Sequence, residues 1–178
     1  MSDAVIDSST PVVRDERTLL HDYLNAQRAH ILGALEGLDD EALRRPVLPS
    51  GWSCLGLVQH LTLDVERFWF AGVMAGDRAV LDALDAGGNA WVVDPDVPAS
   101  AVLEGYREEI IRSDLVIAGL DLLAPPGFWP EDLFGNWHPE SLGRVILHVM
   151  TETAGHTGHL DAVRELIDGT QWLVLEEG

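Results

Sequence analysis

One segment of the chain, LGRVILHVMTETAGHTGHLDAVRELIDG (residues 142–169), carries several metal-ligating residue types at helical spacing. On an ideal helical wheel, four of its side chains fall within about 40° of one direction: His148, Glu152, His156 and His159. The apolar residues that must pack occupy the same side, so the sequence predicts an ionisable stripe inside an apolar stripe. A buried charge without a partner is costly, so these groups must be paired, neutral or bound to a cation.

A metal ion would satisfy several of these groups at once. Glu152 and His156 lie one turn apart, about 6 Å along the helix, so both side chains can reach one ion. A second apolar segment, residues 54–74, carries His60 at the edge of its apolar face. These three residues make the two-histidine, one-carboxylate set of an open, catalytic metal site. The alternative from spacing alone is a buried hydrogen-bond network without metal.

Further side chains are predicted to support these ligands or to line a pocket beside them, namely Asp64, Arg67, His148 and His159. Arg67 lies two turns after His60, where it meets either an anionic substrate or a neighbouring carboxylate. Cys54 suits a small core residue better than a nucleophile. Most of the six tryptophans are predicted to pack, and those in the long loops to cover the mouth of a pocket.

The elements that must position these groups are helices. Apolar residues at three-to-four spacing predict long helices over residues 15–38, 53–76, 98–123 and 141–169, with a short one near 79–85. Long loops separate the second helix from the third and the third from the fourth, and such loops often carry function. The sequence therefore predicts an all-α, antiparallel-type four-helix bundle, a single domain over residues 15–178 behind a flexible tail, residues 1–14.

The composition limits the classes of binding partner that we expect for this chain. Thirty acidic residues against eleven basic ones give a net charge of −19, which disfavours nucleic acids and anionic membranes as partners. No apolar run reaches the roughly 18 residues of a membrane span, and no signal peptide is recognisable, so we expect a cytoplasmic protein. The single cysteine excludes an internal disulfide and a Cys-rich zinc site, which leaves histidine and carboxylate as metal ligands.

Two segments carry a resemblance to a known family, RRPVLPSGWSCLGLVQHLTLDVERFWF (residues 44–70) and HVMTETAGHTGHLDAVRELIDG (residues 148–169). They resemble the DinB superfamily, in its uncharacterised branch related to mycothiol-dependent maleylpyruvate isomerase. The similarity covers residues 15–169 and implies a DinB-like four-helix bundle that holds a divalent metal. His60 and His156 match two of the family's ligands. Many relatives have a third histidine where this chain has Glu152, and the isomerase type also has a carboxylate there.

The resemblance also implies an activity. In several relatives the metal binds and deprotonates a low-molecular-weight thiol, so a metal-dependent thiol transferase or thiol-dependent isomerase-like enzyme acting on a small electrophilic substrate is expected. Zinc is the first expectation for the metal, with nickel, manganese and iron as alternatives, and a homodimer is common among relatives. Whether the chain is an enzyme stays open, because a non-catalytic metal- or small-molecule-binding bundle and a metal-dependent hydrolase are alternatives.

Overall fold

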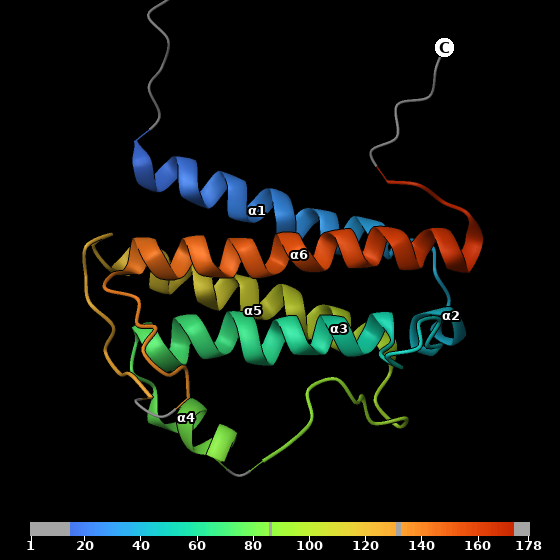
Figure 1. The fold of residues 1–178 in the computed structure, drawn as a ribbon, viewed down its shortest axis with the longest axis horizontal. Coiled ribbons are helices and arrows are strands. Elements are labelled where there is room, and N and C mark those ends of the chain that lie inside the picture. The colour runs from blue at the N-terminus through green and yellow to red at the C-terminus, as the bar shows by residue number, and fades with distance from the viewer. Residues whose placement is uncertain (1–14, 86, 131–132, 173–178) are drawn as a thin grey trace, which may run out of the picture.

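The computed structural model describes residues 15–85, 87–130 and 133–172, so the predicted tail, residues 1–14, lies outside the described residues. The helices follow in the order α1 (Glu16–Ala34), α2 (Asp40–Arg44), α3 (Cys54–His60), η1 (Leu61–Met74), α4 (Arg78–Asp85), α5 (Ala99–Gly119) and α6 (Leu142–Asp168). α3 and η1 form one continuous rod, which packs against α5 and α6, and α1 packs along α6 (Figure 1). The predicted all-α four-helix bundle is confirmed. Across the described ranges, no helix has the length and apolar character to cross a membrane.

Polar caps fix several helix ends. Ser53 accepts the backbone N–H of Gly56 at 3.1 Å at the start of α3. Gly169 ends α6 at φ 78°, a left-handed conformation that glycine adopts without steric cost. Residues 40–44 lie between the first two predicted helices and form α2, which Asp39 caps by accepting the N–H of Ala42 at 2.8 Å.

The helix directions differ from a simple antiparallel bundle. α1 and α6 run in the same direction, since contacts between them advance along both helices, from Gln27–Thr157 to His30–Asp161. α3–η1 and α5 also share one direction, opposite to the first pair (Figure 1). The predicted antiparallel packing therefore holds only between the two pairs. Because α5 starts beside the start of α3, residues 75–98 must return along the length of the bundle, and this explains the long connection.

The rod that carries His60 changes its winding after that residue. The N–H of Ala75 donates to the carbonyl of Phe70, five residues back, at 2.9 Å, the pattern of a π-helix. Successive side chains of η1 are buried on several sides, among them Val65, Glu66, Phe68, Trp69 and Phe70. A wheel of ideal α-helical geometry therefore gives wrong directions for the side chains of η1, which follow His60 in the chain.

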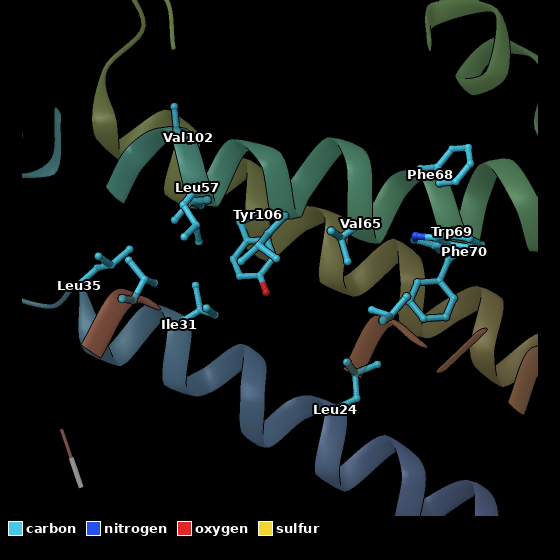
Figure 2. Packing of buried hydrophobic residues seen from close by; sticks show 14 of the residues in the cluster. Leu24, Ile31, Leu35, Leu57, Val65, Phe68, Trp69, Phe70, Val102 and Tyr106 are labelled. Atoms are coloured by element: carbon cyan, nitrogen blue, oxygen red, sulfur yellow. The ribbon is translucent and has the colours of Figure 1, made fainter. Parts of the chain in front are cut away.

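The core lies between four rods, namely α1, the continuous α3–η1, α5 and α6 (Figure 2). Tyr106 of α5 reaches between α1 and the α3–η1 rod, where Ile31 and Leu57 are also fully buried. Farther along the bundle, Phe70 of η1 and Leu24 of α1 fill the corresponding layer. Each rod thus contributes apolar side chains to one continuous core.

A buried ion pair crosses this core. Nε and Nη2 of Arg28 donate to the two carboxylate oxygens of Glu66 at 2.7 and 2.6 Å, and the side chains are 2% and 1% exposed. Nη1 of Arg28 also donates to Asp114 at 2.7 Å. Burial disfavours the guanidinium charge, but the two carboxylates outweigh burial and raise the pKa of Arg28. The pair therefore ties α1 to η1 and, through Asp114, to α5.

Removing one partner of this pair should destabilise the fold more than removing both. Glu66→Leu leaves a buried guanidinium short of its main partner, so the free energy of unfolding should fall by about 3–5 kcal/mol in urea denaturation. The double variant Arg28→Met/Glu66→Leu should lose less, because no charge stays buried. The exposed pair Arg144–Glu140 is the control, and its double variant Arg144→Met/Glu140→Leu should change stability by under about 1 kcal/mol. Equal losses in the single and double core variants would contradict this account.

Candidate functional site

His60 and His156 meet where α6 packs antiparallel against the α3–η1 rod. Their ring centroids lie 5.1 Å apart, with the planes inclined at 72°. Nδ1 of His60 forms a 2.9 Å hydrogen bond with Oδ2 of Asp64, one turn later. A carboxylate on one ring nitrogen fixes the orientation of the imidazole and leaves the other nitrogen for a metal or a proton.

His156 has an unusual environment for a histidine. Its Nδ1 atom is buried and has no hydrogen-bond partner among the described residues. Burial, and then the neighbouring rings of His60 and His159, lower the pKa of His156 to about 4, although Glu152 acts in the opposite direction. The imidazole is therefore neutral at pH 7, and a neutral imidazole can donate a lone pair to a cation.

Two members of the predicted stripe are exposed, which corrects the expectation that the stripe lies inside the apolar face. Glu152 and His159 both face solvent, and His156 is partly buried. The buried face of α6 is centred on Val149, Thr153 and Leu160, to one side of the stripe. The stripe therefore borders the core, and the charge of Glu152 needs no buried partner.

The predicted ligands are close but are not assembled around a common point. Within the ranges that the structure describes, no group of three or more His, Cys, Asp and Glu side chains is placed to hold a metal. The residues nevertheless fit a metal in their chemistry, because a buried nitrogen of His156 lies beside His60 and has no partner among the residues that the structure describes. Glu152 acts electrostatically on His156 and is exposed, so its side chain can reorient without disturbing the core.

Trp91 covers these histidines. It belongs to the long connection that returns from η1 to the start of α5, which we name the return connection. Its ring stacks on His60 with centroids 4.2 Å apart and planes inclined at 18°, and lies 5.8 Å from the ring of His156. Nε2 of Gln59 donates to the carbonyls on either side, Ala90 at 2.8 Å and Val92 at 3.2 Å. A Cβ atom on Gly56 would collide with the carbonyl oxygen of Trp91, so only glycine allows this close approach.

Sequence reasoning named the loop tryptophans as covers but missed Gly56 and Gln59. A signal for Gly56 was present, because a glycine inside a helix costs about 1 kcal/mol relative to alanine and so suggests a packing reason. No comparable signal marks Gln59, whose partners lie thirty-one and thirty-three positions away in the chain.

The remaining predicted residues divide between two places. Asp64 and Arg67 line a pocket of about 580 Å³ between η1, α4 and residues 87–90. His148 lies apart from His60, in an aromatic cluster made by Trp69, Trp129, Phe134 and Trp137. Burial lowers the pKa of His148. The structure thus brings together His60, Asp64, His156 and His159, with Glu152 at their edge, and separates His148 from them.

Cys54 packs in the core at the start of α3. Its side chain is 1% exposed, and burial raises the pKa of the thiol to about 11. Because the thiolate is the nucleophile, this cysteine does not supply chemistry to the site at neutral pH.

Cys54 should therefore resist alkylation in the folded protein. At pH 8 iodoacetamide should modify it at least about a hundredfold more slowly than in the urea-unfolded chain, since burial and a raised pKa both suppress the reaction. Mass spectrometry of timed samples gives both rates from the same thiol. Comparable rates in the two states would mean that Cys54 is accessible and activated.

Gly56→Ala should move Trp91 away from His60 while leaving the helix intact. The added methyl group meets the carbonyl of Trp91, so the loop must shift even though alanine favours the helix. ¹⁹F NMR of protein labelled with 5-fluorotryptophan, with the resonance of Trp91 assigned by Trp91→Phe, would show the change. Gly105→Ala on α5 is the matched control, because a Cβ atom there meets nothing within 4 Å. An unchanged Trp91 resonance in Gly56→Ala would contradict the close contact.

Comparison with known proteins adds one finding. The family model described as mycothiol-S-transferase (MST) matches residues 19–169 of this chain of 178 residues, a span that includes both rods of the histidine site. No curated protein matches the chain.

Proposed function

This chain belongs to the mycothiol-S-transferase family, and we propose that it transfers a low-molecular-weight thiol to a small electrophilic substrate at a divalent metal. His60, Glu152 and His156 are the proposed ligands. The observation that carries the proposal is the meeting of His60 with His156, whose buried Nδ1 has no hydrogen-bond partner in the described part of the chain. The family name supports mycothiol as the thiol.

Each residue has a definite task in this proposal. A bound divalent cation would lower the pKa of a coordinated thiol and so favour the thiolate. Asp64 holds the ring of His60 through Nδ1, and burial holds the ring of His156 in place. Glu152 supplies a carboxylate from the solvent side. Nitrogen and oxygen ligands suit zinc first, with nickel, manganese and iron as alternatives.

The reaction needs two substrates to approach one place, and the surroundings of Trp91 support this. The pocket of about 580 Å³ includes Asn89 and Ala90, and a second pocket of about 320 Å³ includes Asn89, Trp91 and Trp52. Residues of the return connection therefore line both pockets. In the transfer, the thiol loses its proton to solvent, its sulfur bonds to the electrophilic carbon, and the leaving group departs with the electron pair. Trp91 shields His60 from water, which disfavours hydrolysis of the acceptor.

Metal analysis of protein purified without an affinity tag tests the proposal first. Wild type supplied with zinc, nickel or manganese should bind about one ion per chain, and His156→Ala should lose it while keeping its helical circular dichroism. His138→Ala is the control, because His138 is exposed and contacts Trp129 away from His60. Absence of metal from the wild type after supplementation would overturn the proposed site.

Activity then separates the alternatives. Wild type with metal, mycothiol and a monochlorobimane acceptor should consume thiol and acceptor together, and His156→Ala should not. Acceptor loss without thiol loss would instead indicate a hydrolase, and metal binding without turnover of a broad set of electrophiles would indicate a binding bundle.

A further inference from the structure

We infer that the larger pocket, between η1 and α4, is a binding site for small organic carboxylates, whose anionic group is held by Arg67. Only the identification of this carboxylate as the acceptor substrate rests on the proposed function. The lining of the pocket and the free donors of Arg67 support the carboxylate site independently of that function.

The pocket has the size and the lining for a small molecule with an apolar body. Its volume, about 580 Å³, falls in the usual range for ligand sites. Small side chains make most of the wall, and few of them compete with a ligand for space: Ala79, Val80, Ala83, Gly87, Gly88 and Ala90. The polar groups are few, and they come mainly from one edge, formed by Gln59, Asp64 and Arg67.

Arg67 is held in place by a buried carboxylate and keeps donors to spare. Its Nε and Nη2 donate to Oε2 of Glu109 at 2.9 and 2.6 Å, and Glu109 is 2% exposed. A guanidinium carries five N–H groups. The two on Nη1 and one on Nη2 have no partner among the described residues, while the side chain is 37% exposed. Such a fixed fork with free donors suits a carboxylate.

The charges around the pocket also favour an anion at Arg67. Oε2 of Glu109 accepts from Arg112 as well, at 3.0 Å, so one carboxylate serves two guanidinium groups. Arg112 pairs further with Glu108, but both of those side chains are exposed to solvent, which weakens their field. The negative group in the pocket wall, Asp64, is engaged by His60. Among the described lining residues, Arg67 is the basic side chain, so it marks the place where the pocket can hold an anion.

The pocket also points toward the histidines. Asp64 both lines the pocket and bonds to His60, and Gln59 both lines the pocket and holds the loop of Trp91. A molecule anchored at Arg67 therefore lies on the same edge of the pocket as Asp64 and Gln59, the side chains that bond to His60 and to the loop of Trp91. This assigns the acceptor to small electrophiles that carry a carboxylate.

Binding to metal-free protein tests this inference. The probes are benzoate and phenylacetate, each compared with its neutral amide and titrated into ¹⁵N-labelled, chelator-treated protein. The acids should give saturable shifts at Gly87 and Gly88 and should bind at least about tenfold more tightly than the amides. Arg67→Gln and Ala83→Phe should each weaken the acids at least about tenfold, the first by removing the donors and the second by filling the pocket. Arg107→Gln, an exposed arginine of α5, makes the same charge change elsewhere and should have no effect.

The outcomes distinguish this inference from the proposed function. No saturable binding of either acid, or equal binding by Arg67→Gln, would overturn the carboxylate site. If Arg67→Gln does not fold, Ala83→Phe decides, because Ala83 is exposed on α4 and its replacement leaves the Arg67–Glu109 pair intact. The titration contains no metal and no thiol, so its failure leaves the transfer proposal standing, and failure of metal binding leaves this result standing.

Discussion

The parallel orientation of α3–η1 and α5 is the constraint on which the candidate site depends. Two parallel neighbours joined in sequence need a connection that runs back along their length. That connection includes α4 and residues 87–98, and it passes beside His60. Residues of this return connection line both pockets at the site, and Trp91 belongs to it. The bundle supplies the two histidines, and the return connection supplies Trp91, which covers them.

Buried polar groups in the core and at the candidate site differ in whether they have hydrogen-bond partners. Arg28 and Glu66 satisfy each other in the interior. Three buried side-chain atoms have no partner among the described residues: Tyr106 Oη, Ser113 Oγ and His156 Nδ1. The first two belong to side chains that are almost wholly enclosed, whereas His156 is partly exposed and faces a second imidazole. An unsatisfied atom at such an edge calls for a functional explanation.

The sequence predicts those features of the fold that depend on residues close together in the chain. Apolar spacing and polar caps locate the four rods, and the wheel places His60 and His156 on or beside the apolar faces of their own helices. The exposure of Glu152 depends on which partners α6 packs against, which spacing along one helix cannot give. The π winding of η1 leaves side chains buried on several sides, which a wheel of α-helical geometry does not predict. The hold of Gln59 on the loop of Trp91 joins residues distant in sequence, and no local pattern encodes it.

The ion pair between Arg28 and Glu66 has a consequence for how this fold can diversify. Without Glu66, Arg28 keeps only one of its two carboxylate partners, Asp114, and without Arg28 the charge of Glu66 is buried with no cation to pair with among the described residues, so the two positions are strongly epistatic. A lineage that exchanged one residue first would pass through a poorly folded intermediate, even if the final apolar pair were stable. Relatives of this chain are therefore expected to fall into groups that keep both residues or replace both, separated by a barrier in sequence space.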